Sequence, residues 1–191
     1  GLGGILRTSA VNGPLTTVLV DRDGVLCEDP RNFVKSVAEL IVIPRSLEAL
    51  HRLTRAGVTV AIISNQSGVG RGFLSEQTLA QITEVLLTHI GAAGGQVAGV
   101  YYCVHTPDDG CDCRKPKPGL VRQAADELGF DPVEAVMVGD HICDLQLAKA
   151  VGARCILVLT GQGAEQVQFA QNMRPDAVTR DLLAAVPIIL S

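Results

Sequence analysis

The chain has 191 residues, of which 47% are hydrophobic and 19% charged, and its formal net charge is -4. That length and apolar content are enough for one globular domain with a buried core, and a second full domain is not expected. The acidic balance, with no run of five like charges, argues against a nucleic-acid-binding surface. No stretch approaches the roughly 18 consecutive apolar residues of a membrane-spanning helix. We therefore expect a monomer that binds neither nucleic acid nor a membrane.

The N-terminal segment 1–14 holds four glycines and no apolar period, which indicates a tail or an additional edge segment ahead of a single domain at residues 15–191. We assign it no function. The six cysteines are scattered, apart from Cys103, Cys111 and Cys113. Because disulfide frameworks are typical of small secreted domains, this pattern favours a reducing, cytoplasmic location.

Five segments rich in valine and isoleucine are almost continuously apolar, which predicts strands buried on both faces. They span residues 16–21, 58–64, 100–104, 135–140 and 155–160. Between them, leucine and isoleucine recur at helical spacing, with caps and ends expected at Ser46, Gly57, Ser75, Gly129 and Gly152. A last short helix is expected at residues 181–190, limited in length by Pro187. The alternation predicts a doubly wound, mostly parallel, Rossmann-like α/β sheet with helices on both faces.

In open parallel sheets, ligands bind beyond the carboxyl ends of the strands. Asp21, Ser64 and Asp140 each fall at such an end, so three distant segments are expected to meet at one edge. Phosphoryl transfer needs a nucleophile, a proton donor and positive charge around the phosphoryl oxygens. These residues, together with Lys115, can supply all of them.

Asp21 and Asp23 lie two residues apart on an extended segment, so their side chains share one side. One carboxylate can attack phosphorus while the other protonates the leaving alkoxide and later activates water. Two carboxylates this close repel each other unless a cation lies between them, and Mg²⁺ prefers carboxylate, water and phosphate oxygens. Asp140 is the natural further ligand. Asp144 either supports the metal, directly or through water, or caps the following helix.

Ser64 and Asn65 can donate hydrogen bonds to phosphate oxygens, and Lys115 supplies positive charge during transfer. Arg114 and Lys117 flank Lys115. Spacing does not decide which of these three basic side chains faces solvent. We expect His141, beside Asp140, to face water.

Three thiols and one imidazole lie within eleven residues, as Cys103-Val-His105 and Cys111-Asp-Cys113. This Cys₃His combination suits tetrahedral Zn²⁺, and the segment between the two pairs contains turn residues that can bring them together. A catalytic zinc needs an open coordination position, which four protein ligands do not leave. The pattern predicts a structural zinc site that staples loop 103–113, with a redox disulfide as the alternative. The remaining thiols, Cys27, Cys143 and Cys155, are expected to be unreactive side chains.

The Asp-x-Asp-Gly-Val start, the Ser-Asn-Gln segment, the lysine and the Gly-Asp-x-x-x-Asp end resemble the four motifs of the haloacid dehalogenase superfamily of phosphatases. The resemblance spans about residues 16–163. It implies Asp21 as the nucleophile that forms an aspartyl-phosphate, Asp23 as general acid and base, Ser64 as phosphate ligand and Lys115 as charge stabiliser. Magnesium would be held by Asp21, Asp23 and Asp140. The inserts over the crevice are short, which implies a minimal cap.

Within the superfamily, Cys-x-His-x-Pro followed by Cys-x-Cys-Arg-Lys-Pro resembles two zinc-containing branches, the D-glycero-D-manno-heptose 1,7-bisphosphate 7-phosphatases and the histidinol-phosphate phosphatases. Residues 64–72 are similar to the Asn-Gln-Ser-Gly-x-x-Arg-Gly segment of the heptose branch. This resemblance implies Mg²⁺-dependent removal of the 7-phosphate from the heptose bisphosphate, with the sugar bisphosphate held by Asn65, Arg71, Arg114 and Lys115. Two alternatives stay open: hydrolysis of histidinol phosphate or another small phosphomonoester, and a zinc-stapled binding module without activity.

Overall fold

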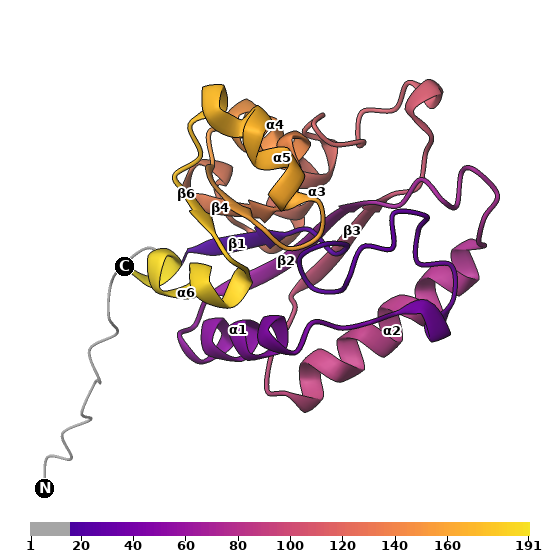
Figure 1. The fold of residues 1–191 in the computed structure, drawn as a ribbon, viewed down its shortest axis with the longest axis horizontal. Helices are drawn as coiled ribbons and strands as arrows, with labels where there is room; N and C mark the ends of the chain where they lie inside the picture. The colour runs from indigo at the N-terminus through magenta and orange to yellow at the C-terminus, as the bar shows by residue number, and fades with distance from the viewer. Residues whose placement is uncertain (1–15) are drawn as a thin grey trace, which may run out of the picture.

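The computed structural model describes residues 16–191, so the predicted N-terminal segment 1–14 lies outside the described part of the chain. Within these residues, six strands form one parallel sheet in the order β3-β2-β1-β4-β5-β6 (Figure 1). They are β1 (Thr17–Val20), β2 (Thr59–Asn65), β3 (Gly99–Cys103), β4 (Ala135–Gly139), β5 (Arg154–Val158) and β6 (Ala177–Thr179). The predicted doubly wound α/β fold is confirmed.

Helices cover both faces of the sheet (Figure 1). One face carries α1 (Pro44–Arg55), α2 (Glu76–Ala92) and α6 (Leu182–Leu190), and the other carries α3 (Gly119–Leu128), α4 (Ile142–Val151) and α5 (Gly163–Ala170). Short 3₁₀ helices lie in the connections at η1 (Val37–Glu39), η2 (Pro107–Asp109), η3 (Pro132–Glu134) and η4 (Gln171–Met173). No helix within residues 16–191 is both long and apolar enough to cross a membrane.

The strands are buried on both faces because successive side chains point to opposite sides of a sheet. In β1, Val18 and Val20 pack in the cluster with α1, α2 and α6, while Leu19 packs in the cluster with α3, α4 and α5. Each strand therefore presents apolar side chains to two helical layers. This is the reason that the strand segments read as continuous rather than alternating apolar runs.

Two local features differ from the sequence expectations. Helix α1 begins at Pro44, two residues before Ser46, whose hydroxyl instead donates to the carbonyl of Val25 at 2.6 Å. Strand β6 is not among the predicted strands, because it has three residues and one of them, Val178, is exposed. The short helix expected at residues 181–190 is confirmed: α6 has nine residues, Leu182–Leu190, and includes Pro187.

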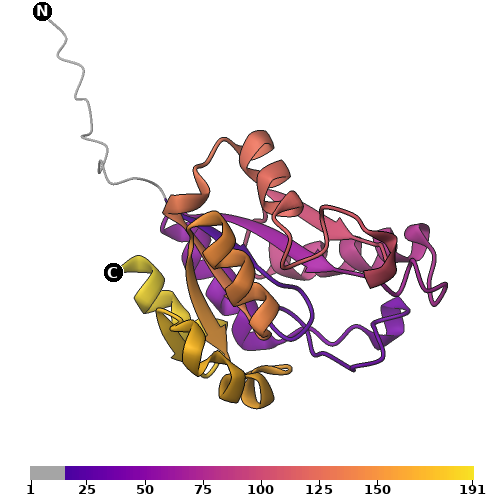
Figure 2. The ribbon, with the colours of Figure 1, turned by 90° about the horizontal axis from the view of Figure 1, so that it is seen from above.

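The loops that follow β1, β2 and β3 project from the same end of the sheet (Figure 2). These segments, residues 21–43, 66–75 and 104–118, contain no α-helix and only the single turns η1 and η2. This end of the molecule, with its minimal cap, holds the predicted site residues.

Candidate active site

A buried lysine joins the carboxylates at the carboxyl ends of the central strands. Lys115 Nζ lies 3.3 Å from Asp21 Oδ2 and 2.7 Å from Asp144 Oδ1, and it donates to the carbonyl of Ile63 at 2.9 Å. Lys115 is 4% exposed and Asp144 is fully buried. The structure thus brings together residues separated by up to 123 positions in the chain. Of these residues, Asp21 and Lys115 line a pocket of about 290 Å³, and Asp140 lines it as well.

Glycines let these carboxylates approach the backbone closely. Gly24 has a φ of +87°, and a Cβ at this position would collide with the carboxylate of Asp140. A Cβ at Gly139 would collide with the carboxylate of Asp144. The backbone N–H of Gln162 donates to Asp140 Oδ2 at 2.9 Å. These glycines therefore determine where the acidic groups can lie.

The acidic groups repel one another. Burial raises the pKa of Asp21 to about 6, although the charge of Lys115 opposes the shift. Burial, followed by the charges of Asp21 and Asp144, raises the pKa of Asp140 to about 9. For Lys115, burial lowers the pKa, but the two carboxylates outweigh it and hold the pKa above its ordinary value.

Three carboxylates form a group that fits a hard divalent cation. One oxygen each from Asp21, Asp140 and Asp144 lies within 4.8 Å of the other two. Asp144 Oδ2 is buried and has no hydrogen-bond partner among residues 16–191. A cation among these oxygens would relieve their repulsion and give that oxygen a partner.

The carboxylate of Asp23 does not belong to this group, which differs from the predicted magnesium set. Asp23 Oδ1 accepts from Arg22 Nε at 2.8 Å, and Asp23 Oδ2 accepts from Gln66 Nε2 at 3.1 Å. The side chain of Asp23 still lines the pocket, where its exposed fraction is 18%. A buried guanidinium on the adjacent residue thus draws this carboxylate away from the other three.

The predicted phosphate and substrate residues also line the pocket, but one of them is already engaged. Asn65 Oδ1 accepts from the backbone N–H of Lys115 at 2.9 Å, and its Nδ2 donates to the carbonyl of Lys115 at 3.2 Å. Asn65 therefore fixes the backbone at Lys115. Ser64 Oγ accepts from Gln66 Nε2 at 3.0 Å. Arg71 and Arg114 also line the pocket, and Arg114 Nη1 is buried without a hydrogen-bond partner in the described chain.

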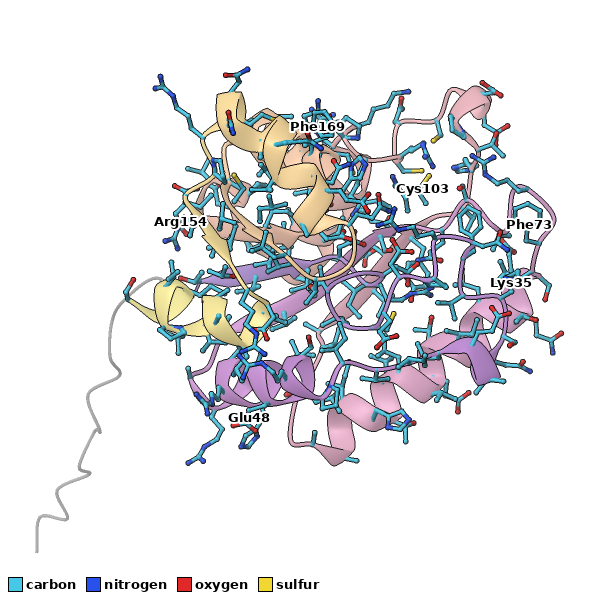
Figure 3. The ribbon with its side chains drawn as sticks, in the orientation of Figure 1. Lys35, Glu48, Phe73, Cys103, Arg154 and Phe169 are labelled. Atoms are coloured by element: carbon cyan, nitrogen blue, oxygen red, sulfur yellow. The ribbon has the colours of Figure 1, made fainter. Side chains whose placement is uncertain are left out.

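The four predicted zinc ligands converge. His105 Nδ1 lies 3.5 Å from Cys103 Sγ and 3.3 Å from Cys113 Sγ, and the Sγ atoms of Cys103 and Cys111 are 3.7 Å apart. Sulfur atoms gather beside Cys103, where the loop leaves β3 (Figure 3). Burial opposes ionisation of Cys111, but N–H groups of Arg114 and Cys113 outweigh it and lower its pKa to about 6. The cluster has the donor set and the thiolate character of a closed metal site.

Comparisons with known proteins agree with this geometry. Residues 112–185 match a family model described as HAD-hydrolase-like. D-glycero-β-D-manno-heptose-1,7-bisphosphate 7-phosphatase of Pseudomonas aeruginosa is 45% identical over 76% of this chain and 82% of its own length. The chain belongs to the haloacid dehalogenase phosphatases.

Other relatives cover more of the phosphatase. The enzyme with the same name from Bordetella bronchiseptica is 41% identical over 91% of this chain and 97% of its own length. A crystal structure of D,D-heptose 1,7-bisphosphate phosphatase from B. bronchiseptica, complexed with magnesium and phosphate, has a TM-score of 0.86. It is 39% identical and covers 92% of this chain and 98% of its own. A structure from Burkholderia thailandensis is 30% identical with a TM-score of 0.72. The phosphatase is thus a phosphoric monoester hydrolase.

The structure also resolves two alternatives that the sequence of the phosphatase left open. Helix α4 is capped by His141, whose Nδ1 accepts from the N–H of Cys143 at 3.1 Å, whereas Asp144 pairs with Lys115. His141 lines the pocket, and burial lowers its pKa. Lys117 lies outside the pocket lining and donates to the carbonyl of Cys111 at 2.7 Å, so it supports loop 103–113.

Further lining residues of the phosphatase carry no motif that would have identified them. They include Asp29, Arg31, Phe33 and Gln162. Arg31 and Phe33 have φ values of +63° and +61°, which are unusual for residues other than glycine. Gln162 Nε2 donates to Asp29 Oδ2 at 2.9 Å, and Arg31 pairs with Glu165 of α5. The loop after β1 is thereby tied to α5 across the pocket rim.

Proposed function

We propose that this phosphatase removes the 7-phosphate from D-glycero-D-manno-heptose 1,7-bisphosphate through an aspartyl-phosphate intermediate. The observation that carries the proposal is the carboxylate of Asp21, which lies 3.3 Å from Lys115 Nζ in a pocket that arginines also line. The names of the relatives supply the substrate.

The proposed reaction has two halves. Asp21 attacks phosphorus, the bond from phosphorus to the sugar oxygen breaks, and Asp23 gives a proton to the departing alkoxide. Water then attacks the phosphoryl group while Asp23 takes its proton, which releases phosphate and restores Asp21. Lys115 and the hydroxyl of Ser64 stabilise the phosphoryl oxygens throughout. Magnesium, held by Asp21 and Asp140 and supported by Asp144, would neutralise charge on the phosphoryl group.

The pocket suits a substrate with two anionic ends. Lys115 serves the reacting phosphate, and the guanidinium groups of Arg71 and Arg114 line the same pocket, where a second phosphate would lie. Asn65 contributes by fixing the backbone of Lys115. Histidinol phosphate, with one phosphate and a cationic amine, would leave these arginines without an anion.

A substrate panel tests the proposal. With Mg²⁺ present, kcat/KM for heptose 1,7-bisphosphate should exceed that for histidinol phosphate, and phosphorus NMR should show loss of the 7-phosphate with the 1-phosphate retained. Preference for histidinol phosphate, or release of the 1-phosphate first, would refute the assignment. Arg71→Met should reduce the difference in kcat/KM between a bisphosphate and a monophosphate substrate. Arg52→Met, on the exposed face of α1, should leave this difference unchanged.

The raised pKa values predict a stability that depends on pH and magnesium. Because the pKa values of Asp140 and Asp21 lie at about 9 and about 6 without metal, the folded protein binds protons that the unfolded chain has released. Their contribution to the stability of the fold is fully present below their pKa values in the unfolded chain. It is lost as the pH rises through their higher pKa values in the folded protein. In magnesium-free buffer, Tm should fall between about pH 5 and pH 9.

Thermal unfolding at several pH values checks this prediction. Added Mg²⁺ should raise Tm more at about pH 8 than at about pH 5, since bound protons compete with the metal at low pH. Asp140→Asn should remove most of the magnesium effect. An increase in Tm of equal size at both pH values would contradict the carboxylate site.

We also propose that loop 103–113 holds a structural zinc ion. Purified protein should contain about one equivalent of zinc per chain. Cys111→Ala should lose the metal and lower both Tm and activity, because the loop leads directly into Arg114 and Lys115. Cys155→Ala, a buried cysteine outside the cluster, should keep the metal. Unchanged Tm and activity in a zinc-free protein would contradict a structural role of zinc in this loop.

The remaining proposals concern organisation. We take residues 15–191 as one phosphatase domain that acts as a monomer on a small phosphorylated sugar in the cytoplasm. The six cysteines are free thiols, which is compatible with a reducing compartment. Size-exclusion chromatography with light scattering tests the monomer.

A further inference from the structure

Arg22 lies between the two site aspartates in the chain and is fully buried. Removing a guanidinium from water is unfavourable by several kcal/mol unless the charge is paired and its N–H groups are satisfied. The proposed reaction gives Arg22 no role. Its burial directly below the pocket therefore needs a cause.

The contacts of Arg22 point to Asp23. Arg22 Nε donates to Asp23 Oδ1 at 2.8 Å and Nη2 donates to Asp23 Oδ2 at 3.3 Å, which is a two-point ion pair. Nη2 also donates to Gln66 Oε1 at 3.0 Å, and the guanidinium lies 5.6 Å from the ring centre of Tyr102. Burial lowers the pKa of Arg22, but Asp23 outweighs it and raises the pKa above its ordinary value, so the guanidinium stays charged.

Two further donors complete the surroundings of Asp23. Gln66 Nε2 donates to Asp23 Oδ2 at 3.1 Å and to Ser64 Oγ at 3.0 Å, so one amide connects the acid/base residue to the phosphate ligand. Cys27 Sγ donates to Asp23 Oδ1 at 3.3 Å. Burial raises the pKa of Cys27, which keeps it a thiol and therefore a donor. Each oxygen of Asp23 thus receives two donors.

We infer that Arg22, assisted by Gln66 and Cys27, is a positioning residue that fixes the orientation of the Asp23 carboxylate. This inference rests on the proposed function, in which Asp23 is the general acid and base. In the second half of the reaction, Asp23 must lie where it can take the proton of the attacking water, and this depends on the orientation of its carboxylate. Loss of the network should slow hydrolysis of the aspartyl-phosphate more than its formation.

Burst kinetics with a chromogenic aryl phosphate separate the two halves. An aryl leaving group departs without a proton donor, so formation of the aspartyl-phosphate should be little affected. Arg22→Met should release about one equivalent of aryl alcohol in a burst, followed by a steady rate at least about tenfold below that of the parent. Arg22→Lys, which keeps the charge, should recover part of the steady rate. Lower activity without a burst would overturn the inference, because a general defect slows both halves.

Matched variants separate this role from a structural one. Thr179→Val removes another buried hydrogen bond, from the Thr179 hydroxyl to the carbonyl of Asp181, on β6, three strands away from β1 in the sheet, and should lower Tm without a burst. If Arg22→Met does not fold, the pair Cys27→Ala and Cys27→Ser decides, since serine keeps a donor to Asp23. A burst in the alanine variant alone supports the inference, and identical kinetics overturn it.

The variant Asp23→Asn tells a failure of this inference from a failure of the proposed function. If Asp23→Asn turns over at the parent rate, the acid/base assignment itself is wrong. If Asp23→Asn shows the burst while the Arg22 and Cys27 variants do not, the positioning role of Arg22 is refuted and the acid/base role of Asp23 stands.

Discussion

Replacing Asp21 with asparagine should abolish turnover and leave the protein folded. Asparagine has nearly the same shape but no carboxylate to attack phosphorus, so kcat should fall by at least about 1000-fold. Tm should hold or rise. Burial raises the pKa of Asp21 to about 6, which means that its charge destabilises the fold near neutral pH, and asparagine removes that charge.

Steady-state kinetics, thermal unfolding and intact-protein mass spectrometry check this result. The parent enzyme, quenched in acid during turnover, should carry a phosphoryl group on Asp21, and the asparagine variant should carry none. Asp176→Asn, which alters an aspartate outside the pocket, is the matched control and should keep full activity. Residual hydrolysis above a few per cent would mean that another residue attacks.

Breaking the buried pair of Lys115 and Asp144 should have the largest effect on stability. Lys115→Met leaves the carboxylates of Asp21 and Asp144 buried without their cation. Removing one partner of a buried ion pair is unfavourable by about 3–5 kcal/mol. Activity should disappear as well, because Lys115 is the protein cation that faces Asp21, where the phosphoryl group is transferred.

A double variant distinguishes charge from packing. Lys115→Met combined with Asp144→Asn removes one unpaired charge, so urea unfolding should show part of the stability restored while activity stays absent. Arg52→Met breaks the exposed pair with Glu48 and should lower stability by less than about 1 kcal/mol. A double variant as unstable as Lys115→Met would show that the loss came from packing rather than from the stranded charge.

The strands, and the edge of the sheet where the site residues meet, could be predicted from the sequence because both depend on the local pattern of apolar residues. Continuous apolar runs can be buried only between two helical layers, and Asp21, Ser64 and Asp140 follow such runs directly. The topology then brings those ends together. Strand β6 was not predicted, because a three-residue edge strand has too few residues to show an apolar pattern.

The Cys₃His cluster of loop 103–113 could also be predicted from the sequence, since the donor types and their spacing are local. The roles of residues such as His141 and Asp144 could not be predicted in this way. The cap of α4 is His141, and Asp144, three residues later, is committed to Lys115, which lies 29 positions away in the chain. No local spacing distinguishes a capping aspartate from one that neutralises a distant buried lysine.

The sequence by itself determined the fold class, the edge of the sheet at which chemistry occurs and the residue types that occur there. Periodicity decides which residues are buried, and parallel strands all end at one edge. Only the tertiary structure decided which way each charged side chain turns. Asp21 faces Lys115, whereas Asp23 turns to Arg22 and Gln66. The physical reason is desolvation: a buried charge adopts whichever orientation gives it a partner, and those partners come from segments that only folding brings together.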